Sequence, residues 1–268
     1  KRDLPWRDTT PWGVMVSEYM LQQTPVNRVL PKWNEWMERW PTPKDLAKAT
    51  PAQVITAWGR LGYPRRALRL HAAAQIIAED FNNKVPDDQE TLQLLPGVGE
   101  YTAAAIAAFA FEHRSLVMDV NIRRLLVRAI DGQEHPKPAA TAREKARRLA
   151  VLPEKNAHVW AAATMELGAL VCTSKNPSCE FCPIIGQCNW RKNGYPKTEL
   201  IRKSQDWHGT DRKCRGTIVQ ALRENESLTE IAIKKLWPDE SQVEKALKTL
   251  LADQLIQALP RGRYRLPQ

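Results

Sequence analysis

Four cysteines are crowded into one short segment of this chain. Cys172, Cys179, Cys182 and Cys188 are separated by six, two and five residues, whereas Cys214 stands apart and is interpreted as an ordinary thiol. Four thiolates this close in sequence can converge on one metal centre. Tetrahedral zinc sites usually show two short Cys-x-x-Cys pairs with a longer spacer, and only one such pair occurs here. The spacing therefore favours a [4Fe–4S] cluster, with zinc as the alternative.

A glycine-containing turn, L-P-G-V-G, lies directly before an alanine-rich helix within residues 94–119. Gly97 and Gly99 have no Cβ, so the backbone can turn tightly and come close to a ligand. The N–H groups at a helix start can bind an anion such as phosphate. The run 103–110 is so small and apolar that the helix is expected to be buried. The alternative is a glycine C-cap followed by a buried helix that binds nothing.

Two carboxyl groups stand where acid–base chemistry could use them. Asp119 follows the alanine-rich helix after a short polar break, and Glu18 is flanked by methionine, valine, tyrosine and leucine residues. Burial among apolar side chains favours the protonated form of a carboxyl group, which suits a general acid. The alternative for Glu18, and the commoner case for a helical glutamate, is a solvent-facing position.

A tyrosine is predicted to lie on a tight turn among arginines. Gly59, Gly62 and Pro64 break the helical pattern around Tyr63, and arginines follow at helical spacing. An aromatic side chain at such a turn can wedge between stacked bases. The alternative is a tyrosine that covers a helix end beside a solvated basic face.

The composition is consistent with a polyanionic partner. The 268 residues include 40 Lys and Arg against 30 Asp and Glu, which gives a formal charge of +10 and a pI near 9.5. We find no apolar run of membrane-spanning length and no secretory signal, and expect no membrane partner.

The periodicity of apolar residues predicts an all-α protein up to about residue 250. Helices are expected over 12–25, 26–42, 43–58, 71–81 and 156–171. Within 43–58, Pro51 after Thr50 is typical of a helix N-terminus. A basic helix is expected from residue 141, with its charged face solvated. A basic linker, 191–213, precedes a different pattern in 214–268. Three helices are expected there, over 215–224, 228–236 and 241–253, followed by two short strands about an Arg261-Gly-Arg263 turn. This order is typical of a winged helix. A small helical cap that binds nothing is the alternative.

Several motifs together resemble the helix-hairpin-helix DNA glycosylase superfamily with an iron–sulfur loop. The segments L-P-W-R, W-G-V-M-V-S-E-Y-M-L-Q-Q-T, L-G-Y, L-P-G-V-G-E-Y-T-A and M-E-L-G-A-L-V-C-T, together with the cysteine spacing, are similar to the MutY-type adenine DNA glycosylases. The resemblance covers about residues 3–190. It implies a catalytic domain, 1–190, of two helical subdomains that includes a [4Fe–4S] loop at 172–188.

The resemblance also implies roles for particular residues. Glu18 matches the acid that protonates adenine and then handles the attacking water, and Asp119 matches the carboxylate that stabilises the oxocarbenium-like sugar. Asn121 matches a residue that supports Asp119, although Val120 stands where the family has glycine. The turn Leu95, Pro96, Gly97, Val98 and Gly99 matches the hairpin that binds the DNA backbone, where the family often holds a monovalent or divalent cation.

Further matches concern the substrate base and the duplex. Trp6, Arg7, Leu21 and Glu166 match the adenine pocket. Gln22, Gln23 and Tyr63 match residues that fill or wedge the duplex, with Pro64 in place of a second tyrosine. Tyr101 stands where strand-cleaving relatives carry a nucleophilic lysine, which argues against a Schiff-base lyase.

These matches predict a monofunctional adenine DNA glycosylase of base excision repair, a hydrolase. The expected partner is double-stranded DNA with an A:8-oxoguanine or A:G mismatch, and the expected form is a monomer in the cytoplasm of a bacterium, near the nucleoid. The C-terminal region does not resemble the Nudix-like domain common in this family. The alternatives are a thymine glycosylase for T:G mismatches with the same fold and a non-catalytic iron–sulfur DNA-binding protein.

Overall fold

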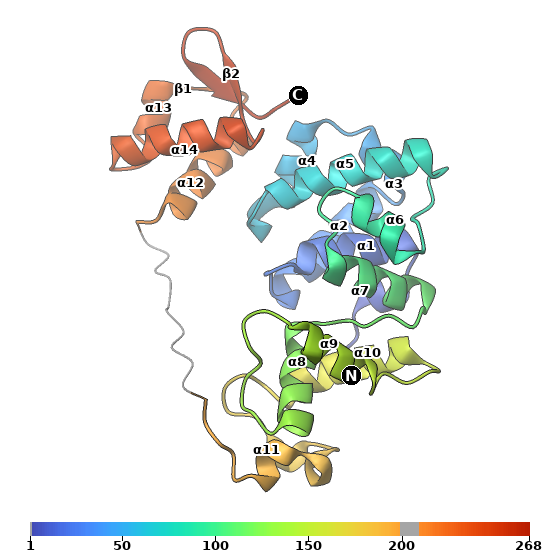
Figure 1. Ribbon diagram of the computed structural model, residues 1–268. Helices are drawn as coiled ribbons and strands as arrows, with labels where there is room; N and C mark the ends of the chain where they lie inside the picture. The colour runs from blue at the N-terminus through green and yellow to red at the C-terminus, as the bar shows by residue number, and fades with distance from the viewer. Residues whose placement is uncertain (1, 199–208) are drawn as a thin grey trace. The chain divides into compact units, whose positions relative to one another are not determined.

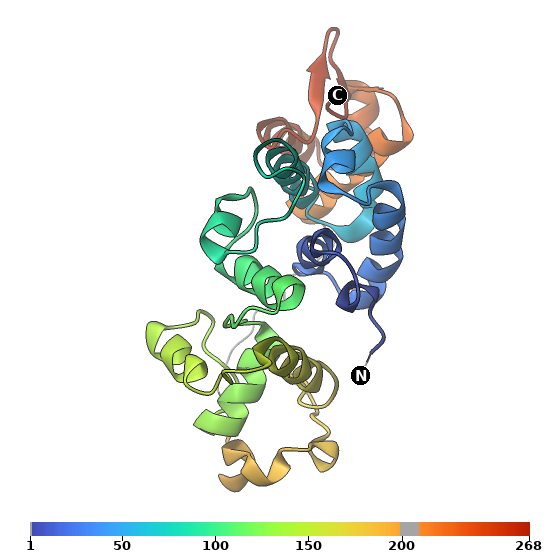
Figure 2. The ribbon, with the colours of Figure 1, turned by 90° about the vertical axis from the view of Figure 1, so that its right-hand side faces the viewer.

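The computed structural model describes residues 2–198 and 209–268 and is almost entirely helical, with strands confined to the C-terminal region (Figures 1 and 2). The chain divides into two compact units. The first contains Lys1–Met15, Asp87–Leu94 and Val98–Arg202, and the second contains Val16–Pro86, Leu95–Gly97 and Lys203–Gln268. Within the described residues, no helix is long and apolar enough to span a membrane.

The N-terminal helices form as the apolar pattern predicts, with one difference. The segment 43–58 contains two helices because Thr50 caps a new one: its side chain accepts a hydrogen bond from Gln53 N, Gln53 returns one to Thr50 N, and Pro51 suits the first helical position. The helices of this region are α1 (Pro11–Leu21), α2 (Val26–Arg39), α3 (Pro43–Ala47), α4 (Pro51–Trp58) and α5 (Arg65–Asp80).

A tryptophan cluster forms part of the core of the second unit. The rings of Trp36 and Trp40 meet edge-to-face at 4.8 Å, and those of Trp36 and Trp58 at 5.4 Å. All three are buried although charged residues flank the first two in sequence. Such edge-to-face pairs stabilise a core beyond the area that they bury.

The first unit is organised around α7 (Glu100–Phe111), whose residues 103–108 are all buried. Ala105 and Ala108 share a cluster with Ile122 of α8 and Ala161 of α10. The small side chains let these helices approach closely, so the expectation of a buried helix is confirmed. The other elements of this unit are α6 (Gln89–Leu94), α8 (Val120–Leu126), η3 (Val127–Asp131), α9 (Ala142–Leu149), α10 (Ala157–Leu170), η4 (Cys179–Phe181), η5 (Ile185–Gln187) and α11 (Asn189–Lys192); a short η1 (Pro5–Arg7) precedes α1.

The C-terminal region has the element order of a winged helix. It contains α12 (Asp211–Glu224), β1 (Leu228–Thr229), α13 (Glu230–Lys234), α14 (Glu240–Ala252), β2 (Gln257–Leu259) and β3 (Arg263–Arg265). The antiparallel sheet has the order β1-β3-β2, with Leu228 opposite Tyr264. Sequence reasoning placed Leu228 and Thr229 in a helix, which is wrong: two residues are too few to show alternation, and only pairing with β3 defines the strand.

Candidate active site and cysteine loop

The glycine turn contains one position that only glycine can occupy. Gly97 has φ +87°, and a Cβ there would lie 3.0 Å from both Arg69 Cβ and Tyr19 Cε1. The Tyr19 hydroxyl donates a 2.5 Å hydrogen bond to Pro96 O, and Leu95 is buried. The tight turn predicted at Gly97 is therefore required by the packing around it.

Gly99 differs from Gly97. It is the N-cap residue of α7 with extended backbone angles, φ −95° and ψ 177°, and no atom lies within 4 Å of a Cβ built there. The fold does not need glycine here for conformational reasons, contrary to the interpretation that treated both glycines alike. The exposed helix start beside it is open space, where a ligand could approach the backbone N–H groups.

Glu18 lies on α1 with only 6% of its surface exposed. Its neighbours in the helix, Val16, Tyr19 and Met20, are all buried. The solvent-facing alternative for Glu18 is therefore wrong. A carboxyl held in this position is sheltered from bulk water, as a general acid requires.

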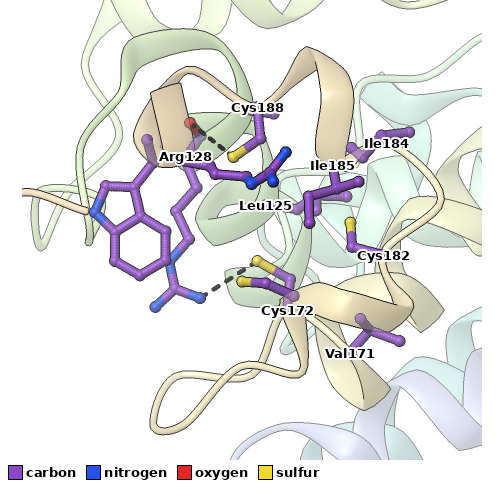
Figure 3. A pocket seen from close by; sticks show the side chains of 12 residues that line it. Leu125, Arg128, Val171, Cys172, Cys182, Ile184, Ile185 and Cys188 are labelled. Carbon is purple, nitrogen blue, oxygen red and sulfur yellow. Dashed lines mark hydrogen bonds between the residues drawn. The ribbon is translucent and has the colours of Figure 1, made fainter. Parts of the chain in front are cut away.

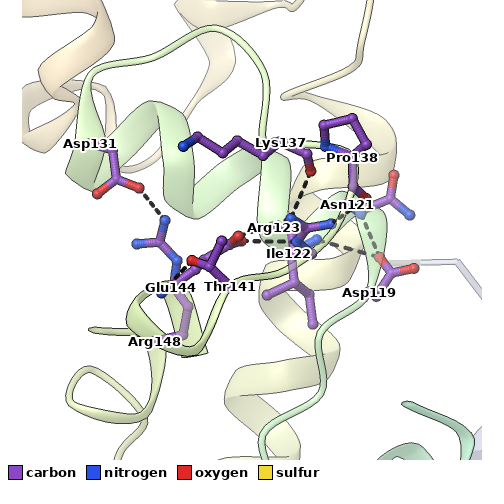
Figure 4. A network of polar contacts seen from close by, with 10 residues as sticks. All are labelled: Asp119, Asn121, Ile122, Arg123, Asp131, Lys137, Pro138, Thr141, Glu144 and Arg148. Carbon is purple, nitrogen blue, oxygen red and sulfur yellow. Dashed lines mark hydrogen bonds and ion pairs between the residues drawn. The ribbon is translucent and has the colours of Figure 1, made fainter. Parts of the chain in front are cut away.

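Asp119 is the N-cap residue of α8, and Figure 4 shows its carboxylate turned toward the helix start. Asp119 Oδ1 accepts hydrogen bonds from Asn121 N at 2.6 Å and Ile122 N at 3.4 Å. Two backbone donors fix the orientation of the carboxylate. The local sequence D-V-N-I thus positions Asp119 and Asn121 together.

Asn121 is held by two residues that sequence reasoning did not single out. Arg124 donates to Asn121 Oδ1 at 2.8 Å, to Gly168 O at 2.5 Å and to Cys172 O at 2.7 Å. A Cβ at Gly168 would lie 2.5 Å from Asn121 O, so α8 and α10 touch where only glycine fits. The close approach of α10 therefore fixes the backbone of Asn121.

A polar network, drawn in Figure 4, holds the segment after α8 against the helix. Arg123 donates to both carboxylate oxygens of Glu144 at 2.9 Å, and these two hydrogen bonds lower the pKa of Glu144. Arg123 also donates to Lys137 O at 2.9 Å. Arg148 is fully buried and paired with Asp131. The expectation of a solvated basic face on α9 is therefore wrong for Arg148. The carboxylate of Asp131, which precedes α9 in the sequence, offsets the cost of burying this guanidinium.

Arg7 and Glu166, both predicted to line the adenine pocket, are ion-paired. Arg7 Nη2 lies 2.5 Å from Glu166 Oε2, and Trp6 is buried beside Arg7 in η1. Arg2, which sequence reasoning missed, donates to Glu166 from its backbone N at 2.8 Å and from Nε at 3.0 Å. Burial alone raises the pKa of Glu166, but the hydrogen bonds from Arg2 and Arg7 outweigh it and lower the pKa from 4.5 to about 2.

We expect Glu166 to make folding stability pH-dependent below pH 4.5. Because its pKa is lower in the folded state, the ionised form stabilises the fold above the unfolded pKa, and this contribution is lost as the pH falls toward 2. The Glu166→Gln variant lacks the contribution. Urea unfolding should show a difference of about 2 kcal/mol at most from the parent at pH 6, shrinking toward zero near pH 2. A constant difference across this range would contradict the prediction.

Tyr101 lies in the first turn of α7 and is half-buried. It packs against the cluster that contains Ala105, Ile122 and Ala161. A tyrosine supplies no amine at this position, and the absence of lyase chemistry remains a prediction.

Arg66 connects the Gln22 and Tyr63 turns, both predicted to contact the duplex. It is buried, and its guanidinium donates to Gln22 O, to Met20 O at 3.0 Å and to Gly62 O at 3.0 Å. Burial lowers the pKa of Arg66 to about 10, so the side chain stays charged at neutral pH. The backbone carbonyls of Gln22 and Gly62 therefore share one charged donor, the Arg66 side chain of α5.

We predict that Arg66→Met lowers the free energy of unfolding by about 3 kcal/mol, because it leaves several buried carbonyl groups without their charged donor. The neighbouring Arg65→Met is the matched control, since the Arg65 side chain is 54% exposed and paired with Asp253. The control should lose less than about 1 kcal/mol. Equal losses in urea denaturation would show that Arg66 has no special structural role.

The four clustered cysteines line one cavity in the first unit (Figure 3). Arg128 Nη1 lies 3.3 Å from Cys172 Sγ, and Cys188 Sγ donates to Arg128 O at 3.7 Å. Burial, and then the nearby Cys172, raise the pKa of Cys179, and burial raises that of Cys182. The rest of the lining is apolar or basic: Leu125, Ala129, Val171, Ile184, Ile185, Trp190 and Arg191.

This donor set fits an iron–sulfur cluster. The four thiols border one shared cavity whose remaining lining is apolar or basic. A [4Fe–4S] core needs thiolates spread around a cube. Arg128 and Arg191 place positive charge on the lining of the cavity, which would offset the negative charge of thiolate ligands.

The fold and these motifs define a class of protein. The chain belongs to the HhH-GPD superfamily of base excision DNA repair proteins, whose family model matches residues 16–150. Among its relatives is the adenine DNA glycosylase of Mycobacterium tuberculosis (strain ATCC 25618 / H37Rv), 47% identical over 99% of this chain and 89% of its own length. The adenine DNA glycosylase of Mycolicibacterium smegmatis is 44% identical over 99% of this chain and 92% of its own length. The human adenine DNA glycosylase is 41% identical over 72% of this chain and 37% of its own length.

Solved structures share the fold. A thermostable thymine-DNA glycosylase superposes with a TM-score of 0.66 at 24% identity, covering 72% of this chain and 89% of that one. An endonuclease III in a non-covalent DNA complex gives 0.61 at 20% identity, covering 70% and 87%. The all-α helix-hairpin-helix prediction is confirmed. Pairings that would join the two units, such as Glu18 with Asp119 or Leu21 with Glu166, remain predictions.

Proposed function

We propose that this protein hydrolyses the N-glycosidic bond of adenine mispaired in double-stranded DNA. The observation that carries the proposal is the 47% identity to an adenine DNA glycosylase over 99% of the chain. The burial of Glu18 and the oriented carboxylate of Asp119 support it, because a protein that only binds DNA needs neither.

The two carboxyl groups suit different parts of the reaction. Adenine leaves poorly until a ring nitrogen is protonated, and the sugar then develops positive charge. Glu18 protonates the base and afterwards accepts a proton from the attacking water, while Asp119, held by the N–H groups of Asn121 and Ile122, stabilises the sugar cation. The base must leave the stack to reach them.

The glycine turn serves the DNA backbone in this proposal. Gly97 permits the tight turn, and the open helix start at Gly99 binds phosphate, with a monovalent or divalent cation at the turn. Gln22, Gln23 and Tyr63 fill the space from which adenine is flipped. Arg7, Glu166, Trp6 and Leu21 recognise the base itself. The enzyme acts as a monomer in the bacterial cytoplasm, with residues 1–190 as the catalytic domain and 214–268 as a separate winged-helix-like domain.

The test is a single-turnover incubation with four duplexes, which carry A opposite 8-oxoguanine, A:G, T:G and U:G. We expect adenine release from the first two and no strand cleavage without added base, because Tyr101 cannot form a Schiff base. Release of thymine from T:G without release of adenine would favour the thymine glycosylase. Binding without any base release would favour a non-catalytic DNA-binding protein.

Cys172, Cys179, Cys182 and Cys188 hold a [4Fe–4S] cluster in this proposal, and the bound cluster braces the loop 172–188. Purified protein should contain about four iron atoms and four acid-labile sulfides per chain and absorb broadly in the visible range. The Cys182→Ser variant should lose iron and visible absorption, whereas Cys214→Ser, which removes a buried thiol outside the loop, should retain both. One zinc atom per chain without sulfide would identify the zinc alternative.

A further inference from the structure

The C-terminal winged-helix-like domain and helices α4 and α5 belong to one compact unit. Ile55 of α4 lies within the apolar core of the domain, and Ala52 and Leu68 pack against the same core. Arg223 Nε donates to Ile55 O at 3.1 Å. The domain therefore packs onto the helices on either side of the Tyr63 turn.

An ion cluster ties the domain to the residues that follow Tyr63. Asp253, after α14, accepts Arg65 Nη1 at 3.2 Å and Arg215 Nη2 at 2.5 Å. Arg65 is the first residue of α5, two positions after Tyr63. A carboxylate between two guanidinium groups at a partly buried site restricts both of them.

One side chain of the domain lies directly on the Tyr63 ring. The guanidinium carbon of Arg212, the second residue of α12, is 4.1 Å from the ring centroid. A Cβ built on Gly62 would lie 4.0 Å from Arg212 Nη2, so the same guanidinium also covers the turn backbone. Tyr63 nevertheless keeps 39% of its surface exposed. The arginine thus supports one side of a protruding aromatic ring.

The helix that usually reads DNA in a winged helix is poorly suited to do so here. α14 begins with Glu240 and also carries Glu244, and both pair with Lys234, at 3.4 and 3.0 Å. Carboxylates at the start of a groove-reading helix would repel the phosphates on either side of the groove. The start of α12 is more basic, because Arg212 and Lys213 there outnumber Asp211.

We propose that the C-terminal domain contributes Arg212 to the duplex-binding surface, as a positioning residue for the Tyr63 wedge. The guanidinium holds the ring in its exposed orientation before DNA binds, so Arg212 acts on the duplex through Tyr63. The inference rests on the proposed function for the role of Tyr63. In this proposal the C-terminal domain helps to bind the mismatched site through Tyr63, and it does not insert α14 into a DNA groove.

A double-mutant cycle measures whether Arg212 and Tyr63 act together in DNA binding. The dissociation constant is measured for a duplex with a non-cleavable abasic-site analogue opposite guanine, so that binding is independent of catalysis. Arg212→Ala and Tyr63→Ala should each weaken binding about tenfold, and the double variant should bind within about twofold of Tyr63→Ala, because each single change already removes the joint contact. Arg39→Ala is the matched control: Arg39 is exposed, and its guanidinium carbon lies 4.5 Å from the centroid of the Trp40 ring.

The control should weaken binding less than about threefold and add independently to Tyr63→Ala. Additive losses of about a hundredfold in the Arg212 and Tyr63 double variant, or an Arg212→Ala loss no larger than that of the control, would overturn the inference. If the alanine variant does not fold, Arg212→Gln completes the same cycle. Adenine release by the parent protein is measured in parallel, so loss of coupling with release intact counts against this inference alone.

Discussion

Replacing Asp119 with asparagine is expected to reduce single-turnover adenine release at least about a thousandfold while leaving the fold and DNA binding intact. Asparagine keeps the shape of the side chain and one acceptor oxygen but removes the negative charge that stabilises the developing sugar cation. Its remaining oxygen can still accept hydrogen bonds from Asn121 N and Ile122 N, as Asp119 Oδ1 does. Asparagine and aspartate are about equally good N-cap residues.

Asp119→Ala separates the two roles of this side chain. It removes both the charge and the cap of α8, so we expect the same loss of adenine release together with about 1 kcal/mol lower stability. Rapid-quench measurement of base release and thermal unfolding distinguish the two variants. If Asp119→Asn retained more than a tenth of the parent rate, a charge at this position would not stabilise the transition state.

Glu18→Gln is expected to lower the rate of adenine release by about a hundredfold to ten thousandfold. Glutamine has the same size as glutamate but cannot give a proton to the base or accept one from water. The side chain at this position is 6% exposed, so bulk water cannot easily replace it as the acid. The affinity for an uncleaved A:G duplex should change less than about threefold.

The neighbouring Ser17→Ala is a useful control for Glu18→Gln, because Ser17 is equally buried on α1 but has no titratable group. Its rate of adenine release should stay within about threefold of the parent. A parent-like rate for Glu18→Gln would remove Glu18 from the mechanism.

The helices illustrate what can be predicted from neighbouring residues. The alanine run of α7 predicted a buried helix because no other packing could use such small side chains, and this was confirmed. The start signal at Thr50 and Pro51 was recognised in the sequence, but 43–58 was still predicted as one helix, whereas the structure has two. The strand β1 was missed because two residues carry no periodic signal and its partner lies 36 positions later in the chain.

Candidate site residues were proposed where their signal is local, and their roles remain predictions. The cysteine spacing, the glycine turn and the D-V-N segment each occur within a short stretch, where the structure shows a shared cavity, a constrained turn and an N-cap. Residues that act through distant contacts were not found. Arg2 and Arg124 have no unusual neighbours in sequence, and only their hydrogen bonds to Glu166 and Asn121 mark them.

The family of this protein, its helical class and its chemical groups could be read from residue types at short spacing. The folded structure was needed to show that Glu18 is buried, that position 168 requires glycine to leave room for Asn121, and that Arg212 lies on the Tyr63 ring. Exposure and contact of this kind arise when segments far apart in the chain pack together. The free energy of such a contact depends on both segments, so neither segment's sequence predicts the contact alone.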